Sequence, residues 1–234
     1  MHRLGFSPAE IDKLISRLKS QNSVLPRSVF SHFVGSDSSE FDDFTAKQFN
    51  LFNDISGKLQ DAFPHKILRH ICNTAGIERF SQYHLDMVRL GIGLYGVNPI
   101  NNNIINNVAS LSTTILQIHD VKAEDTVGYS RKGHLNKLSR IAAIPIGYAD
   151  GLNRHLGCGS AYCLVDGKPA KYVGNICMDV AMIDVTDIPC NEGDKVEIFG
   201  DKLPVSVLSD KLQTIPYEIL TSISERVRRV YFQD

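Results

Sequence analysis

The chain has 234 residues, of which 43% are hydrophobic, so it is long enough to bury a substantial core in one large domain or two modest ones. Its 25 Lys and Arg residues nearly balance 26 Asp and Glu residues, and the net charge of −1 gives no basic excess for nucleic acid or for an anionic membrane. Five scattered cysteines without a C-x-x-C pair argue against disulfides and a metal site, and without a signal-peptide layout or a long apolar run we expect a cytoplasmic protein.

The first hundred residues alternate short apolar runs with helical patterns, as parallel βαβ units do. Ser7-Pro8-Ala9-Glu10 has the spacing of a capping box with proline at the first helical position, and it predicts the start of a helix. The apolar positions of that helix repeat with helical spacing at Ile11, Leu14, Ile15 and Leu18. A second, longer helix is predicted from the apolar positions Phe49, Phe52, Ile55 and Leu59.

Three apolar runs predict strands between and after these helices, at residues 28–33, 66–72 and 87–94, and Arg3-Leu4-Gly5 is counted as the end of a fourth. Four such strands cannot close into a barrel by themselves, whereas eight units make a complete (β/α)8 barrel. We therefore predict that residues 1–104 form the second half of a (β/α)8 barrel. The alternative is a small open α/β domain that is complete as it stands.

Beyond Pro99 the asparagines at 101–103 and 106–107 form a polar linker, and β-rich segments dominate after it. Asp166-Gly167 is a hairpin turn signal within one of these segments. We predict that residues 105–234 form a separate, mainly-β domain, which makes the fold class α/β plus β. Its strands are expected at residues 112–121, 140–146, 163–168, 181–185 and 195–199.

Eight short motifs lie in order along nearly the whole chain: Arg3-Leu4-Gly5, Ser31-His32-Phe33, Asn73-Thr74-Ala75, Arg89 to Gly96, Val127-Gly128-Tyr129, Pro145 to Gly151, Asn175 to Asp179 and Pro216-Tyr217-Glu218. Each would be weak alone, but together they resemble bacterial alanine racemase. That family has a barrel that binds pyridoxal 5′-phosphate and a carboxy-terminal β domain, and it works as a head-to-tail homodimer. The resemblance implies an isomerase that interconverts L-alanine and D-alanine for peptidoglycan synthesis.

The cofactor contacts follow from the same resemblance. It implies that Arg89 contacts the pyridine nitrogen, and a guanidinium, charged up to a pKa of about 12 or more, has no proton to hand over. The unprotonated ring is then a poorer electron sink, which favours racemisation over transamination. The resemblance also implies that the phosphate is held by the Thr74 hydroxyl, the N–H groups of Gly91 and Ile92, and the Tyr217 phenol. The family usually has serine where Thr74 stands.

Racemisation requires two acid-base groups, one on each face of Cα. The resemblance implies that Tyr129 is the base for the L-enantiomer, while the lysine that forms the Schiff base with the cofactor serves the D-enantiomer. Because a tyrosine titrates near pKa ~10, it needs a supporting network, and His32 is implied to bond both Tyr129 and Arg89. Without the resemblance, His32 on an apolar strand would be interpreted as a core residue.

The substrate contacts are implied in the same way. Arg3 and the backbone of Met178 would fix the substrate carboxylate and the cofactor, which orients Cα. Tyr148 and Asp179 would line the entrance and brace that loop. Since the family's β domain reaches into the other subunit's barrel, each site would be shared between two copies.

Two family features have no counterpart in the sequence. No segment resembles K-A-N-A-Y-G-H-G, which carries the Schiff-base lysine, and the lysine carbamylated in many members is missing upstream of Arg3. We therefore expect the chain to be a carboxy-terminal fragment of a longer racemase, in some bacteria fused behind a cell-wall ligase, and to be inactive alone with weak cofactor binding at best. The segment 226–231 also departs from the family's R-V-P-R.

Two alternatives to an alanine racemase fragment stay open from the sequence. The chain could be a non-catalytic scaffold or dimerisation module that donates Tyr129 to an intact subunit, and co-expression with a racemase lacking its β domain would then restore turnover. It could also belong to a racemase of another small amino acid such as serine, since a pocket with Tyr148 and Met178 does not exclude one. A substrate panel would distinguish these enzymes.

Overall fold

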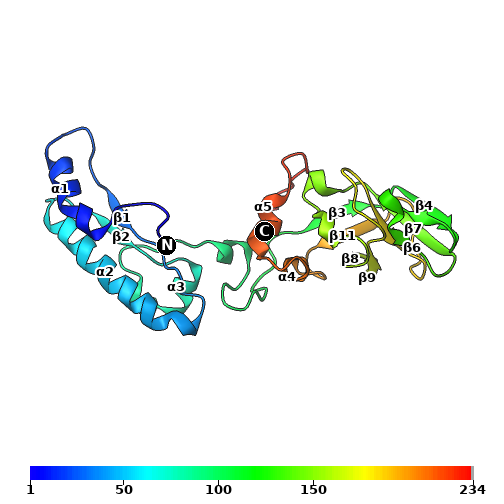
Figure 1. Cartoon of the computed structure of the whole chain (residues 1–234), viewed down its shortest axis with the longest axis horizontal. Coiled ribbons are helices and arrows are strands. Elements are labelled where there is room, and N and C mark those ends of the chain that lie inside the picture. The colour runs from blue at the N-terminus through cyan, green and yellow to red at the C-terminus, as the bar shows by residue number, and fades with distance from the viewer. Residues whose placement is uncertain (233–234) are drawn as a thin grey trace. The chain divides into compact units, whose positions relative to one another are not determined.

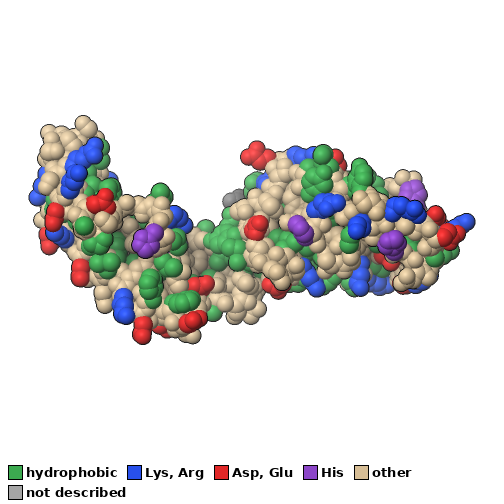
Figure 2. All heavy atoms as spheres, in the orientation of Figure 1, with side chains coloured by type: hydrophobic (Ala, Val, Ile, Leu, Met, Phe, Trp, Pro, Cys, Tyr) green, Lys and Arg blue, Asp and Glu red, His purple; other side chains and the backbone are tan. Residues whose placement is uncertain are grey.

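The computed structural model describes residues 1–232, which divide into two compact units (Figure 1). Unit 1 comprises Met1–Leu94 with Asn98–Asn101, and unit 2 comprises Tyr95–Val97 with the residues from Asn102 onward. The second domain predicted from the sequence runs to residue 234, so its last two residues lie outside the described part. Charged and hydrophobic side chains are mixed over the visible face of both units (Figure 2), in keeping with a net charge of −1.

Unit 1 is built around a pair of parallel strands, β1 (Ser28–Phe30) and β2 (Leu68–His70). The strands are in register from Ser28 opposite Leu68 to Phe30 opposite His70, and the chain between them forms a long helix, so the predicted βαβ unit is confirmed. The helices of this unit are α1 (Ile11–Lys19), α2 (Asp42–Asp61) and α3 (Thr74–Arg79), with 3₁₀ turns at Pro8–Glu10, Ser39–Phe41 and Ser81–Tyr83.

The core of unit 1 lies between α2 and the segments that follow the two strands. Phe52 of α2 is buried against Phe33, Ile71 and Cys72, which come directly after β1 and β2. Phe49 packs on the edge of this cluster, with its ring stacked on Tyr83 at 3.8 Å between centroids. The apolar face predicted for the long helix is thus the face that holds it against the sheet.

The capping box predicted at the first helix forms in part. The backbone N–H and the hydroxyl of Ser7 both donate to Oε2 of Glu10, at 2.8 and 2.7 Å, and the chain then continues from a 3₁₀ turn into α1. The hydroxyl therefore donates where a complete box would have it accept from the helix backbone. Ile11 is buried and Leu14, Ile15 and Leu18 are half-buried, as the helical spacing predicted.

Two predicted strands of unit 1 are wrong. Arg3-Leu4-Gly5 forms a bend in which Gly5 has φ +103°, a left-handed conformation incompatible with a strand. Residues 87–94 form no strand: Asp86, just before them, donates its backbone N–H to the carbonyl of Arg69 in β2, and Arg89 donates its backbone N–H to the carbonyl of Cys72, after β2. These two donors lie three residues apart, whereas a ladder repeats every two. The run then turns into a 3₁₀ helix, Ile92–Tyr95.

Unit 2 contains three antiparallel sheets, with strand orders β3-β11-β8-β9, β10-β7-β4 and β5-β6. The predicted strand at 112–121 is divided at Ile115 and Leu116, because β3 pairs with β11 whereas β4 pairs with β7. The strands are β3 (Leu111–Thr114), β4 (Gln117–Val121), β5 (Thr126–Val127), β6 (Gly133–His134), β7 (Ser139–Ile144), β8 (Tyr162–Val165), β9 (Lys168–Lys171), β10 (Ala181–Asp184) and β11 (Lys195–Phe199).

The hairpin predicted at Asp166-Gly167 is confirmed and joins β8 to β9. Both turn residues have positive φ, +48° and +71°, as a two-residue turn matched to the twist of the strands requires. Two helices that the sequence analysis did not predict, α4 (Val205–Lys211) and α5 (Pro216–Ser222), follow the sheets. Among the described residues, no helix has the length and hydrophobicity needed to cross a bilayer.

Candidate functional site

Arg89 is the centre of the polar cluster in unit 1. Its Nη1 lies 2.5 Å from Nδ1 of His70, and its Nη2 lies 3.2 Å from Nδ1 of His32. Nη2 also donates to the backbone carbonyls of Ser31 at 2.7 Å and of Ile71 at 3.3 Å. The guanidinium is thereby held by the residues that end β1 and β2 and follow them, so the sheet itself fixes its direction.

These contacts determine how both histidines carry their protons. A guanidinium only donates, so Nδ1 of His32 and of His70 must accept, and each neutral ring then keeps its proton on Nε2. Burial lowers the pKa of both imidazoles, and the charge of Arg89 lowers it further. For His32 the charge of Arg3 acts in the same direction. The cluster therefore combines one permanent cation with two neutral N–H donors.

His70 is a residue that the sequence analysis missed. Its ring stacks on Phe30 at 5.3 Å between centroids, and the guanidinium carbon of Arg89 lies 5.1 Å from the centre of the same Phe30 ring. His70 is only 6% exposed in the structure, but its local sequence gives no signal of this burial. The pairing of His70 with Phe30 across the sheet, which places it beside Arg89, could not be found from local pattern.

The thiol of Cys72, next to Arg89, is uncharged. Arg89 donates its backbone N–H to the carbonyl of Cys72, and burial raises the pKa of the Cys72 thiol to about 11. Cys72 is consequently a neutral thiol at pH 7, and its Sγ donates to the carbonyl of Tyr83 at 3.4 Å. Arg89 thus faces no thiolate that would neutralise it.

Thr74, Gly91 and Ile92 come together at the start of α3. The N–H of Gly91 donates to the Thr74 hydroxyl at 2.8 Å, which leaves the hydroxyl proton able to donate to another acceptor. Ile92 follows directly and opens the 3₁₀ helix. A Cβ on Gly93 would lie 3.0 Å from Cγ2 of Thr74, so the glycine allows this close approach.

Hydrogen bonds to Asn73 stabilise the turn on which Thr74 lies. Oδ1 of Asn73 accepts from the N–H of Gly76 at 3.0 Å and from the hydroxyl of Ser36 at 2.8 Å. Arg79 then donates to the carbonyl of Ser36 at 2.9 Å and pairs with Asp42 at 2.8 Å. This chain of contacts joins the loop after β1 to α3, and it fixes the N-cap next to Thr74.

In unit 2, Tyr129 stands on a tight turn. Gly128, Ser130 and Arg131 have φ of +76°, +56° and +54°, and positive φ is costly for the two residues that are not glycine. Nδ2 of Asn175 donates to the Tyr129 carbonyl at 3.1 Å and helps to hold this turn. The Tyr129 side chain is 70% exposed, so the turn presents the phenol outward from the unit.

Tyr148 and Met178 lie on two turns that bond through their backbones. The N–H of Tyr148 donates to the carbonyl of Cys177 and that of Ala149 to the carbonyl of Met178, both at 3.0 Å. A Cβ on Gly147 would lie 2.3 Å from the Met178 oxygen, so only glycine fits between the turns. Tyr148 and Met178 side chains are both about half exposed.

Two further predicted residues belong to unit 2. Asp179, next to Met178, pairs with Arg226 at 2.5 Å. Tyr217 is the second residue of α5, and its ring makes an edge contact with Tyr95 at 6.0 Å between centroids and 73° between planes. The predicted site residues thus fall into two groups, with Arg3, His32, Thr74, Arg89, Gly91 and Ile92 in unit 1 and Tyr129, Tyr148, Met178, Asp179 and Tyr217 in unit 2.

Comparison with protein families gives two matches that together cover most of the chain. Residues 1–99 match the family described as alanine racemase, N-terminal domain, and residues 108–231 match alanine racemase, C-terminal domain. Alanine racemase 2 of Caldanaerobacter subterraneus subsp. tengcongensis is 37% identical over 243 residues, which cover 99% of this chain and 62% of that protein. The chain therefore spans about 62% of the length of this relative.

Solved structures give the same result. Alanine racemase of Clostridium difficile 630 superposes with a TM-score of 0.90 at 33% identity, over 99% of this chain and 62% of that one. Alanine racemase from Bartonella henselae with covalently bound pyridoxal phosphate gives 0.85 at 31% identity, over 99% and 64%. These similarities confirm the fold class predicted from the sequence, a partial barrel domain followed by a β-rich domain.

Proposed function

Because this chain belongs to the alanine racemase family, we propose that it works as the carboxy-terminal part of an isomerase that interconverts L-alanine and D-alanine with pyridoxal 5′-phosphate. The D-alanine would serve peptidoglycan synthesis. The observation that carries the proposal is Arg89, a permanent cation held by the neutral His32 and His70. The 234 residues include no counterpart of the family's K-A-N-A-Y-G-H-G segment, so the chain alone is proposed to be inactive.

The donor set of unit 1 fits this cofactor. The contact to His70 uses one N–H of Nη1, and the contacts to His32, Ser31 and Ile71 share the two N–H groups of Nη2. At most three of the five N–H groups of Arg89 are thus used, and one of the others can donate to a ring nitrogen. When bound, the cofactor supplies the electron sink that makes the Cα–H of alanine acidic. Arg89 would bind the ring nitrogen as a donor that cannot release its proton, and it would keep that nitrogen unprotonated.

Thr74, Gly91, Ile92 and Tyr217 would bind the phosphate. The Thr74 hydroxyl already accepts from Gly91, so its own proton points to a further acceptor, as a phosphate oxygen is. The N–H groups at the start of the 3₁₀ helix and the Tyr217 phenol would add donors of the same kind. A dianion would be held by several short neutral donors, and no lysine would be required there.

His32 would connect Arg89 to the catalytic tyrosine. Since Nδ1 accepts from Arg89, the remaining Nε2–H is a donor, and the proposed acceptor is the phenol oxygen of Tyr129 from a second copy of the chain. Donation to that oxygen would stabilise negative charge that develops there. Tyr129 would take the proton from Cα of L-alanine and return one to the same face in the reverse direction.

The substrate carboxylate would be oriented by Arg3 and by the backbone of Met178. A guanidinium pairs with a carboxylate through parallel N–H donors, which fixes the direction of Cα relative to Tyr129. Tyr148 would line the approach, since its turn is bonded to the Met178 turn. The homodimer proposed here supplies the unit 2 groups of one copy to the unit 1 groups of the other.

The direct test is to combine the chain with the part of the Caldanaerobacter relative that the chain does not cover, where the family's Schiff-base lysine is expected, by co-expression in a strain that requires D-alanine. We expect growth and D-alanine formation from L-alanine in the pair, and neither from the chain alone. Tyr129→Phe should abolish D-alanine formation in the pair, while Tyr162→Phe, a tyrosine on β8, should retain it. An assembled, cofactor-loaded pair that forms no D-alanine would contradict the proposed function.

A further inference from the structure

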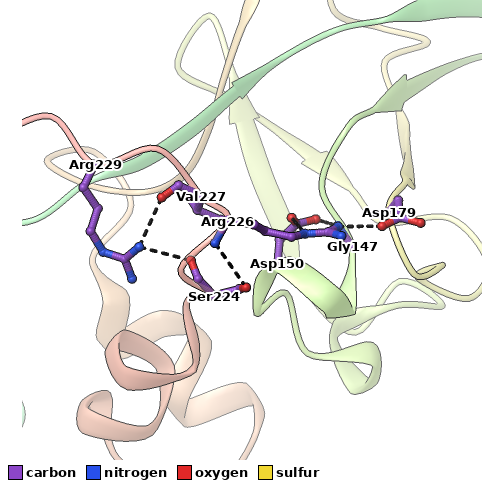
Figure 3. A network of polar contacts seen from close by, with 7 residues as sticks. All are labelled: Gly147, Asp150, Asp179, Ser224, Arg226, Val227 and Arg229. Atoms are coloured by element: carbon purple, nitrogen blue, oxygen red, sulfur yellow. Dashed lines mark hydrogen bonds and ion pairs between the residues drawn. The ribbon is translucent and has the colours of Figure 1, made fainter.

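Arg226 bridges two carboxylates that belong to different turns of unit 2 (Figure 3). Its Nε donates to Oδ1 of Asp150 at 2.7 Å, and its Nη2 donates to Oδ1 of Asp179 at 2.5 Å. Asp150 and Asp179 are 76 and 47 residues away from it along the chain. The two turns are separate in sequence. One guanidinium therefore joins both of them to the segment that follows α5.

The Asp150 carboxylate transmits this contact to the backbone beside Tyr148. Its second oxygen, Oδ2, accepts from the N–H of Gly147 at 2.8 Å and closes the turn on which Tyr148 lies (Figure 3). The carboxylate is only 12% exposed, so it depends on protein donors, whereas Arg226 is about half exposed. Asp179 follows Met178 directly, so the other arm of Arg226 holds the Met178 turn.

The segment after α5 also contacts the first turn through its backbone. The N–H of Ser224 donates to the Asp150 carbonyl at 3.0 Å. Gly151 has φ +107°, and a Cβ there would lie 2.5 Å from the Ser222 carbonyl oxygen, so the two segments meet without room for a side chain. Because α5 begins with Pro216 and Tyr217, this segment is continuous with the helix that carries a proposed phosphate ligand.

The charges of the bridge persist at neutral pH. Burial raises the pKa of Asp150, but the bonds from Arg226 and Gly147 and the charge of Arg226 outweigh it, and the pKa is lowered overall. The two carboxylates in turn raise the pKa of Arg226 above its ordinary value. An isolated surface ion pair contributes little stabilising free energy. Here one cation bonds two carboxylates, and one of these is nearly buried.

We propose that Arg226 is a positioning residue, which sets the Tyr148 turn and the Met178 turn in one arrangement and ties both to the segment after α5. The proposal deepens the proposed function, because these turns are the ones assigned to the substrate entrance and the substrate carboxylate. Arg226 itself is not proposed to contact the substrate or the cofactor. Its effect passes through Asp150 and Asp179.

Amide hydrogen exchange on the full chain, followed by NMR, tests the bridge without any requirement for activity. In Arg226→Gln we expect the N–H groups of Tyr148 and Ala149 to exchange about tenfold faster or more, since hydrogen bonds between charged groups are lost. Amides of the β8–β9 hairpin should keep their rates. Arg226→Lys should restore part of the protection, because one ammonium can bond one carboxylate but cannot span both.

The matched control is Arg229→Gln. Arg229 lies on the same segment, but among residues 1–232 its guanidinium bonds only the carbonyls of Ile223, Ser224 and Val227. Its loss should therefore leave the exchange rates of Tyr148 and Ala149 unchanged. Asp179→Ala removes one of the two acceptors of Arg226, at a half-exposed position, and the exchange rate of Ala149 in this variant decides the question if Arg226→Gln does not fold. Unchanged exchange at both amides, or equal acceleration throughout unit 2, would overturn the proposal.

The two proposals can fail independently. If the racemase pair forms no D-alanine while exchange accelerates locally in Arg226→Gln, the proposed function is wrong and the bridge stands. If the pair is active and the exchange of Tyr148 and Ala149 does not respond to Arg226, the positioning role is wrong and the function stands.

Discussion

Nη1 of Arg89 lies 2.5 Å from Nδ1 of His70, and this contact fixes both the direction of the guanidinium and the tautomer of the imidazole. His32 makes the second contact of the same kind, at 3.2 Å, from the segment after the other strand. A two-stranded parallel sheet is a small scaffold, but its register places both histidines beside Arg89. The chemistry proposed for the chain depends on this arrangement.

Replacing Arg89 should destabilise unit 1. In Arg89→Met, the acceptors on His70, Ser31 and Ile71 lose a charged donor, so we expect the free energy of unfolding to fall by about 2–3 kcal/mol. Urea unfolding followed by circular dichroism measures this. Arg17→Met, at an exposed position of α1, should change the value by less than about 0.5 kcal/mol. Equal effects of the two substitutions would contradict the role given to Arg89.

The stability of unit 1 should decrease in mild acid. Because the pKa values of His32 and His70 are lowered in the folded chain, the unfolded chain binds more protons, and the stabilisation present above the ordinary histidine pKa of about 6.5 is lost as the pH falls through the folded values. His70→Asn should reduce this dependence while its amide oxygen replaces the Nδ1 acceptor. A pH series of urea unfolding between pH 7.5 and about 5 measures both. A stability that rises in that range would contradict the assignment.

Thr74→Val should weaken the binding of pyridoxal 5′-phosphate more than that of pyridoxal. Valine keeps the shape but removes both the acceptor for Gly91 N–H and the donor proposed for the phosphate, so we expect a loss of about tenfold for the phosphate form. Fluorescence titration of the chain with both compounds gives the ratio. Thr74→Ser should retain the preference, and an unchanged ratio in Thr74→Val would count against the phosphate site.

Alanine substitutions at Gly147 and Gly57 should change the free energy of unfolding in opposite directions. A Cβ on Gly147 would lie 2.3 Å from the Met178 oxygen, and Gly147→Ala must move one of the two turns, at a cost of about 2 kcal/mol or more. Gly57 in α2 has no atom within 4 Å of an added Cβ, so Gly57→Ala should stabilise by about 0.5–1 kcal/mol through helix propensity. Thermal unfolding measures both, and a neutral Gly147→Ala would show that the turns are not in contact.

Local chemistry predicted part of the fold, and the parts it missed depend on contacts distant in sequence. The turn at Asp166-Gly167 needs positive φ at both residues, and an Asp-Gly pair is a sequence signal for such a turn. The division of the predicted strand at Ile115 and Leu116 does not follow from its apolar pattern, because it arises where the chain passes from one sheet to another. Residues 87–94 are apolar enough for a strand, yet they form no ladder, and the bond from Arg89 N reaches the carbonyl of Cys72, beyond the end of β2.

The same distinction holds for the site. Arg89, His32, Thr74 and Gly91 were predicted through a family resemblance, and the structure brings Arg89 to His32 and Gly91 to Thr74. Arg226 lies in a segment that departs from the family's R-V-P-R. Its two carboxylates are distant along the chain, so no spacing in the sequence predicts the bridge.

The proposed role of Arg89 requires one protonation state of His32 and of His70, and ¹⁵N NMR of the imidazole rings in the full chain at pH 7 measures it. We expect both rings to be neutral, with Nδ1 unprotonated and Nε2 protonated, and Arg89→Met should allow the ring of His70 to change its tautomer or take up a proton more readily. An imidazolium, or a proton on Nδ1 of either ring in the unchanged chain, would contradict the account of Arg89 as a permanent donor between two neutral histidines.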